Sequence, residues 1–406
     1  MGIVYVGIDW GSEKHAVCVL NDEGKVVAER MLSNEGTFMT SLVAILGGGV
    51  RDVQFAIESR ELPIVDMLLE GGAAVFTVNP KQAERFRDRL SPGGAKDDRR
   101  DARVLAKALR TDAEAFRRVE MESVTQAELR LSGRAAADAE GRFRFAANQL
   151  RAVLARYFPA VLELSSGADE RWLWRLLARS NTPRLAAKLT RRTLEVVLRS
   201  CGVRRIDATR LHEVLGAPHL RAGEGVERAC ADEVGRLIEL LEVLFVQRAR
   251  AEKRRNEALE KVAESQRASS PVSDVDLTAS MPGAGSMVVA TLFGEAAPAL
   301  RERDLAALRA VAGVAPITKR SGKSTQVSMR RARNTLLANA LFHASRVAAM
   351  TDPRFKALYS AIRARGKSYG RALRGVADRY LDVLFAVLRT GKPYDEARGP
   401  SKPVLA

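Results

Sequence analysis

Short apolar runs in the first 80 residues predict a series of β-strands. Polar residues at 21–24 predict a turn, and 62–69 predicts a short helix with Pro63 in its first turn. Strands that first follow one another and then alternate with helices favour a mixed sheet with helices packed on it. The expected strands cover residues 3–9, 15–20, 26–32, 53–57 and 73–78.

The middle of the chain lacks strand signals and is rich in Ala, Leu, Arg and Glu. Its clearest segment is 227–264, where apolar residues from Val234 to Phe245 recur at the i, i+3, i+4, i+7 spacing of one helix face. This spacing predicts a long amphipathic helix. Such a helix either pairs with another in a short coiled coil or packs in an ordinary bundle.

A break at Ser269-Ser270-Pro271 separates this helix from a further domain. Pro282-Gly283-Ala284-Gly285 then predicts the opening turn of a helix. Free backbone N–H groups at such a turn can bind a phosphate, so Gly283 and Gly285 are candidate nucleic-acid contacts; a turn that only opens a helix would have the same sequence. The expected parts are an α/β domain at 1–115, a helical connector at 116–275, a helical domain at 276–390 and a tail at 391–406.

Charge distinguishes the last quarter of the chain from the rest. The whole sequence carries a formal net charge of +17. From Arg301 onward there are 22 basic and 7 acidic residues, so nearly all of the excess lies there. A codon preference for arginine would not concentrate the charge in one region, and a polyanionic partner is the more direct interpretation.

Other features of the composition exclude several classes of protein. A chain of 406 residues with 46% hydrophobic residues can bury a sizeable core. Cys18, Cys201 and Cys230 are far apart and odd in number, which argues against a disulfide framework or a zinc site. No signal peptide or membrane-spanning apolar run is evident, so we expect a cytoplasmic protein without a membrane partner.

Four acidic residues occupy positions that suit a divalent-metal site. Asp9 and Glu58 come at the ends of two predicted strands, and Asp98 and Asp101 lie i, i+3 near the start of a helical stretch. Carboxylates at such positions can converge, and Mg²⁺ prefers oxygen ligands. Alternatively, each acid is a helix cap or a surface charge. The set predicts a site for phosphate chemistry with Mg²⁺, or with Mn²⁺ as an alternative.

The opening segment GIDWGSEKHAVCVL also resembles the phosphate loop of actin-like proteins and sugar kinases. Those proteins need a second Asp-Gly phosphate loop and a Gly-rich adenosine pocket, and neither is found at a convincing position. A basic C-terminal quarter is also foreign to a kinase of small metabolites.

Ser321 lies in a basic loop that suits phosphate chemistry. Its basic surroundings would attract a phosphate and stabilise an alkoxide on the serine. The same serine could instead only contact a phosphate or be exposed, and Ser324 and Thr325 are neighbouring hydroxyls. Candidate nucleic-acid contacts around it are Lys319, Arg320, Lys323, Arg330, Arg331 and Arg333.

Seven segments together resemble one known family. The sequence is similar to insertion-sequence transposases with an RuvC-like DEDD domain and a C-terminal serine domain, which are related to the Piv-type DNA invertases and include members guided by a bridge RNA. The resemblance implies an RNase H-like N-terminal domain, a coiled-coil connector used in oligomer assembly, and a helical domain with a nucleophilic serine. The segments are GIDWG, FAIES, VNPKQ, GAKDDRRDA, MPGAG, AGVAP followed by Ser-Gly, and LRTGKPYDEAR.

Carried over to this sequence, the acidic tetrad of the family falls on Asp9, Glu58, Asp98 and Asp101, and its serine on Ser321. The sequence departs from the family pattern at two places. Ser59-Arg60 follows Glu58 where many members have a small residue and Gly, and Asp97 stands where Thr is frequent, which adds a rival ligand.

The favoured hypothesis is a DNA recombinase in which the carboxylates hold Mg²⁺ against the scissile phosphate and Ser321 forms a phosphoserine link. Its partners would be donor and target DNA, other copies of the chain in a dimer or tetramer, and, by the resemblance alone, a guide RNA. One alternative is a metal-dependent nuclease or junction resolvase that uses water. Another is a nucleic-acid-binding protein without catalysis.

Overall fold

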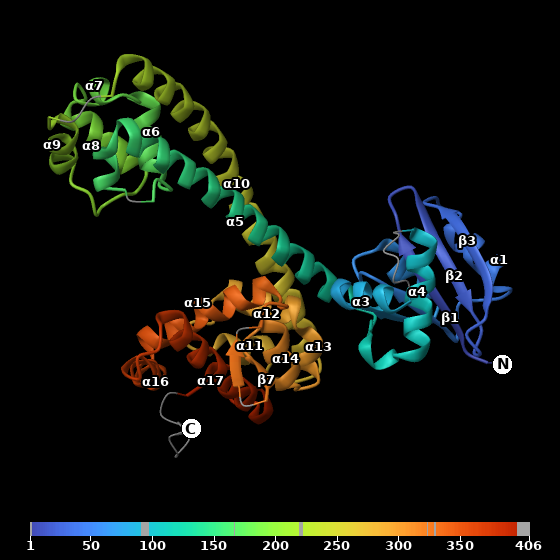
Figure 1. The fold of residues 1–406 in the computed structure, drawn as a ribbon. Coiled ribbons are helices and arrows are strands. Elements are labelled where there is room, and N and C mark those ends of the chain that lie inside the picture. The colour runs from blue at the N-terminus through green and yellow to red at the C-terminus, as the bar shows by residue number, and fades with distance from the viewer. Residues whose placement is uncertain are drawn as a thin grey trace. The chain divides into compact units, whose positions relative to one another are not determined.

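The computed structural model describes residues 2–90, 97–165, 167–218, 222–322, 324–328 and 330–395. The chain folds as two compact units, Met1–Ser123 and Val124–Ala406. Figure 1 shows a sheet with helices in the first unit and mainly helices in the second. No helix in the described ranges has the length and apolar character needed to cross a membrane.

The first unit is built on a six-stranded sheet of order β3-β2-β1-β4-β5-β6. The first three strands pair antiparallel, whereas β1 with β4 and β4 with β5 pair parallel. A mixed sheet is therefore confirmed, and its strand order is consistent with an RNase H-like domain. The short edge strand β6 has no apolar run and was not predicted. The strands are β1 Val4–Trp10, β2 Lys14–Leu20, β3 Val26–Ser33, β4 Val53–Ile57, β5 Ala74–Thr77 and β6 Arg117–Arg118.

Helices cover the sheet of the first unit because its central strands are apolar on both faces. Phe55 and Ile57 of β4 pack into one hydrophobic cluster and Ala56 into another. Such continuous burial is typical of a strand between two layers. The helices are α1 Phe38–Leu46, α2 Pro63–Glu70, α3 Pro80–Leu90 and α4 Asp98–Thr111, with a 3₁₀ turn at Ala113–Ala115.

Two long helices form the axis of the second unit. Helix α5, Val124–Tyr157, packs along α10, Glu224–Arg267. Two ion pairs show that these helices are antiparallel. Lys261, late in α10, pairs with Glu128, early in α5, whereas Arg248, earlier in α10, pairs with Glu140, later in α5. Figure 1 shows this pair as an extended hairpin. The long helix predicted from residues 227–264 is confirmed, and α5 is its partner.

Short helices close one end of this hairpin, where Trp172 and Trp174 are almost fully buried. They share a core with Phe143 of α5 and residues of α10 as far as Leu244. The helices are α6 Arg171–Arg179, α7 Pro183–Ala186, α8 Arg191–Ser200 and α9 Ala208–Gly216, with a 3₁₀ turn at Pro159–Glu163.

A second core joins the C-terminal half of α10 to the remaining helices. Helix α12 begins directly after Gly285, as the glycine-rich turn predicts. The helices are α11 Asp274–Ala279, α12 Ser286–Glu295, α13 Ala297–Arg301, α14 Leu305–Ala312, α15 Thr335–Thr351, α16 Pro353–Ala364 and α17 Tyr369–Thr390.

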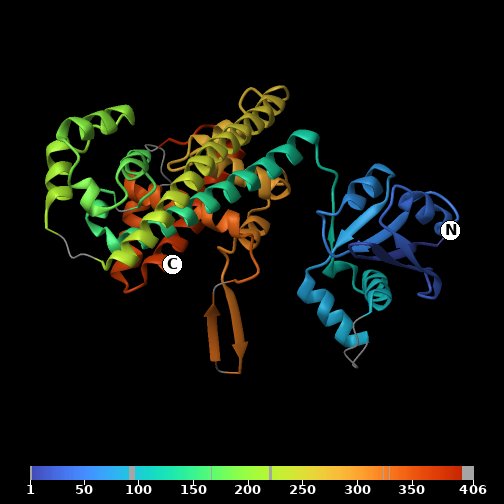
Figure 2. The ribbon, with the colours of Figure 1, turned by 90° about the horizontal axis from the view of Figure 1, so that it is seen from above.

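This C-terminal part is not entirely helical, in contrast to the prediction. Strands β7, Ile317–Ser321, and β8, Ser324–Ser328, form an antiparallel hairpin between α14 and α15. Figure 2 shows it extending from the helices of its unit, with the turn at its far end. Its residues are mostly polar, so no alternation of apolar positions marks the two strands in the sequence.

Candidate acidic site and serine hairpin

Parallel pairing of β1 and β4 brings two of the predicted acids to neighbouring strand ends. Asp9 is the second-to-last residue of β1, and Glu58 directly follows β4. The register pairs Ile8 with Ile57, and Asp9 and Glu58 are the residues that directly follow this pair. Both are half-buried. Strands about 4.8 Å apart can place two such side chains at one point of the sheet edge.

Gly7 allows helix α4 to lie directly on β1. A Cβ atom at Gly7 would be 1.9 Å from the carbonyl oxygen of Ala102 and 2.6 Å from the amide nitrogen of Ala106. Asp9, two residues on, shares the sheet face of Gly7 because side chains alternate along a strand. The glycine of the GIDWG segment therefore brings the sheet face that carries Asp9 against α4.

The direction of α4 turns its first residues toward Asp9. Tyr5, two residues before Gly7, packs in the cluster that holds Leu105 and Leu109. Residues earlier in β1 therefore contact residues later in α4, so the strand and the helix run antiparallel. The first turn of α4, with Asp98 and Asp101, consequently lies toward the strand end that carries Asp9.

The two acids on α4 have different environments. Asp101 is 4% exposed and accepts two hydrogen bonds from Arg87, at 2.6 Å from Nε and 2.9 Å from Nη2. Asp98 is exposed. Asp97 is the N-cap residue, and its side chain accepts a hydrogen bond from the backbone N–H of Arg99. Helix capping therefore accounts for Asp97, whose residue type is among those that favour this position.

Arg87 is bonded to Asp101, and two further predicted acids influence its charge. The pKa of its guanidinium is raised, first by the hydrogen bond to Asp101 and then by the negative charges of Asp101, Glu58 and Asp9. Three acidic residues from β1, β4 and α4 thus act on one cation supplied by α3. Nothing in the sequence around Arg87 distinguishes it from the other arginines of this helix, and it was not predicted as a site residue.

The acidic residues are not arranged as a ready metal site. In the part of the chain that the structure describes, no group of three or more Asp, Glu, His or Cys side chains could hold a metal ion as it stands. The donor chemistry nevertheless fits a hard cation, because carboxylate oxygens are its preferred ligands. The guanidinium of Arg87, bonded to both oxygens of Asp101, already supplies one positive group there.

Ser321 ends β7 at the turn of the hairpin. It is exposed and is paired in register with Ser324 across the turn. Gly322 follows it with φ of +54°, a backbone conformation that favours glycine. The hairpin thus presents the serine hydroxyl at a tight turn, a location that the sequence segment alone did not indicate.

The basic residues near Ser321 are spread along the hairpin and the segment after it. Arg320 and Arg331 are exposed, whereas Arg330 and Arg333 are half-buried. Lys323 and the side chain of Lys319 lie outside the described part of the structure. Their contacts with nucleic acid stay predictions.

A packing role accounts for Gly283 in the glycine-rich turn. Its φ is +78°, and a Cβ atom there would be 2.6 Å from the carbonyl oxygen of Ala344 on α15. Gly285 is the exposed N-cap of α12. Close approach to α15 is sufficient to explain the first glycine, and a phosphate contact by either glycine remains a prediction.

Two parts of the chain match family models of transposases. Residues 6–159 match a family model described as a transposase, and residues 275–360 match the transposase IS116/IS110/IS902 family. The first match includes all four acidic residues, and the second includes the hairpin.

Three relatives cover different shares of the chain. A Sinorhizobium fredii protein assigned as transposase y4uE is 39% identical over 50% of this chain, and the match spans 58% of that relative. A Streptomyces coelicolor protein assigned as the mini-circle transposase for IS117 is 30% identical over 97% of the chain and 96% of its own length. An uncharacterized 43.6 kDa protein of insertion element IS110, also from Streptomyces coelicolor, is 30% identical over 99% of the chain and 98% of its own length. With near-complete coverage at this identity, the chain belongs to the IS116/IS110/IS902 family of transposases.

Proposed function

We propose that this protein cleaves and rejoins DNA, with Mg²⁺ held by Asp9, Glu58, Asp98 and Asp101 and with Ser321 as the nucleophile. The proposal is supported by the parallel register, which brings Asp9 and Glu58 to neighbouring strand ends, and by Gly7, which brings that sheet face against α4. The pKa of Arg87, raised first by its hydrogen bond to Asp101 and also by the charges of Glu58 and Asp9, agrees with this placement. A site that gathers negative charge around one cation can exchange that cation for a metal ion.

In the proposed reaction each residue has a defined role. The four carboxylates would hold the metal ion, and its positive charge would stabilise negative charge on the phosphate oxygens. Arg87 leaves Asp101 so that both oxygens of this carboxylate become available. Asp98 is exposed and can turn toward the metal without losing a buried contact.

Ser321 performs the covalent step. Its Oγ forms a bond to phosphorus and its proton passes to solvent, while the bond from phosphorus to one sugar oxygen breaks and that oxygen takes up a proton. The phosphoserine ester keeps the energy of the broken phosphodiester, so an incoming strand hydroxyl can reverse the step and rejoin DNA. Exposure at a tight turn makes this hydroxyl accessible to a DNA backbone.

Partners beyond DNA follow from the same proposal. Cutting and rejoining two duplexes requires several active sites, so we propose a homo-oligomer, a dimer or a tetramer, that acts in the bacterial cytoplasm. A guide RNA is proposed from the family resemblance. The basic excess of the last quarter would supply phosphate contacts for either nucleic acid.

The test uses end-labelled substrate DNA with full-length wild type, Ser321→Ala, Ser324→Ala and Asp9→Asn proteins. After denaturation, wild type and Ser324→Ala should retain label on the protein, whereas the other two should not. Adducts with Ser321→Ala but not with Ser324→Ala would transfer the nucleophile to Ser324. Cleaved DNA that is never attached to protein would instead favour the nuclease that uses water.

A further inference from the structure

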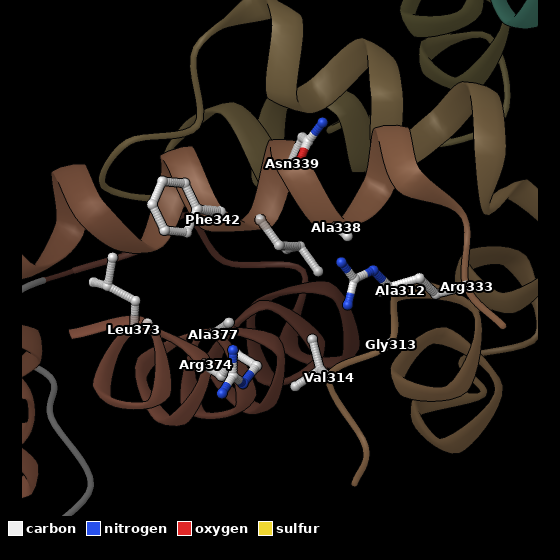
Figure 3. A pocket seen from close by; sticks show the side chains of 12 residues that line it. Ala312, Gly313, Val314, Arg333, Ala338, Asn339, Phe342, Leu373, Arg374 and Ala377 are labelled. Atoms are coloured by element: carbon white, nitrogen blue, oxygen red, sulfur yellow. The ribbon is translucent and has the colours of Figure 1, made fainter. Parts of the chain in front are cut away.

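A cavity of about 150 Å³ lies at the base of the serine hairpin. Gly313 and Val314, which precede β7, line it together with Arg333, which follows β8 and packs against Gly313. Phe342 of α15 and Arg374 of α17 complete the wall, as Figure 3 shows. Both ends of the hairpin thus meet at one hollow within the second unit.

The cavity is rich in positive charge. Arg333 and Arg374 both line it, and Arg374 is exposed and has no ion pair with any other residue in the described ranges. Gly313 sets the path of Arg333: a Cβ atom at Gly313 would be 2.4 Å from Cδ of Arg333, and the φ of Gly313 is +70°. Two guanidinium groups at one hollow suit a phosphate group.

An aromatic ring, that of Phe342, lines the cavity, and two further rings adjoin it. Phe342 is 39% exposed and Tyr369 is 47% exposed, with ring centroids 6.3 Å apart and planes at 76°. Tyr359 continues the group, 6.3 Å from Tyr369. In a chain with only 5% aromatic residues, three adjoining rings, one of which shares a cavity with two arginines, form a distinctive surface. Exposed rings beside arginines are the usual platform for bases of single strands.

The size of the cavity decides between a paired and an unpaired base. A cavity of about 150 Å³ accommodates one benzene-sized ring. A base pair is much larger and would keep its faces stacked within the duplex. The cavity therefore suits one ring of a base that has left its helix, with the connected phosphate outside it.

We propose that this cavity binds one unpaired nucleotide, with its base against Phe342 and its phosphate between Arg333 and Arg374. The inference rests on the proposed action on nucleic acid and adds the state of the strand that is bound. Ser321 is separated from the base of the hairpin by the length of β7, a strand of 5 residues, or roughly 15 Å. The bound nucleotide would therefore hold a strand at a fixed distance from the serine.

The test measures equilibrium binding of full-length protein to short fluorescent oligonucleotides in EDTA, where no metal chemistry occurs. Single-stranded DNA, single-stranded RNA and duplex DNA of the same sequence are compared. Phe342→Leu is matched with Phe145→Leu, which changes an exposed ring on α5, and Arg374→Ala with Arg371→Ala, which changes an exposed arginine on the same helix.

Phe342→Leu should weaken binding of a single strand by about 10-fold, within the range of one lost base stack, and leave duplex binding unchanged. Arg374→Ala should reduce the slope of log affinity against log salt by about 0.7, as for one phosphate of a single strand. The matched variants should change single-strand binding less than about 2-fold. If Phe342→Leu and Arg374→Ala weaken binding of only single-stranded DNA or only single-stranded RNA, that strand is the source of the bound nucleotide. Either result supports the proposal.

The proposal would be overturned if Phe342→Leu weakened single-strand and duplex binding equally, or if it did not weaken single-strand binding. It would also be overturned if Phe145→Leu weakened single-strand binding as much as Phe342→Leu does. A 2-aminopurine base in the single strand gives a second readout, since its fluorescence should fall on binding to wild type but not to Phe342→Leu. If the adduct of Ser321 forms normally while these experiments fail, the cavity proposal alone is wrong. If binding behaves as expected and no adduct forms, the covalent mechanism alone is wrong.

Discussion

Replacing Arg87 by Gln tests whether a guanidinium occupies the place of a metal ion. The substitution removes the positive charge and keeps one amide donor for Asp101. Wild-type Arg87 donates to both oxygens of Asp101, which is 4% exposed, whereas the side chain of Arg87 is 26% exposed. Breaking a buried ion pair costs about 3–5 kcal/mol. Because Arg87 is partly exposed and Gln can still donate a hydrogen bond, we expect the free energy of unfolding to fall by about 2–3 kcal/mol in the absence of metal.

Magnesium should restore part of this stability in the variant. In wild type the ion has to displace Arg87, whereas in Arg87→Gln the carboxylate of Asp101 has lost its cation. Bound Mg²⁺ stabilises the folded state by about 2.7 kcal/mol at 100 times its dissociation constant. The variant should therefore bind Mg²⁺ more tightly than wild type and gain more stability from it.

The assay is hydrogen exchange of peptides from β1 and α4 in the full-length protein, with and without Mg²⁺. Arg89→Gln is the matched control: it lies on the same helix, and its partner Asp112 is 32% exposed, so the loss of this pair should destabilise the protein less than the loss of the Arg87 pair. Isothermal titration with Mg²⁺ gives an independent affinity. An equal response of wild type and Arg87→Gln to Mg²⁺ would refute the reasoning.

Two further predictions concern the first unit. Gly7→Ala should destabilise this unit by about 3–5 kcal/mol, because the added Cβ would be 1.9 Å from the carbonyl oxygen of Ala102. The control is Gly36→Ala, where a Cβ would have no atom within 4 Å, and it should change the free energy of unfolding by less than about 1 kcal/mol. Urea unfolding compares the two variants. Burial lowers the pKa of His15 below its ordinary 6.5, so the unfolded chain binds the proton more readily and stability should fall as pH drops below 6.5. In His15→Phe, the free energy of unfolding measured with urea should depend less on pH below 6.5 than in wild type. The same pH dependence in both proteins would show that His15 is not its cause.

The sequence by itself determined the elements that depend on local pattern. Apolar runs in the first 80 residues predicted the strands near whose ends Asp9 and Glu58 lie, and helical spacing near Val234 predicted α10. The resemblance of seven segments indicated the family. These signals are readable because burial and backbone geometry repeat with fixed periods along a strand or a helix.

Only the tertiary structure decided which side chains meet. Arg87 reaches Asp101 because α3 and α4 pack side by side, and Gly7 lies under Ala102 because α4 crosses β1. The polar strands of the serine hairpin have no period to reveal them, and the cavity joins Arg333 to Arg374 from elements that are distant in the chain. Contacts between distant segments depend on how whole elements pack, so no local pattern records them.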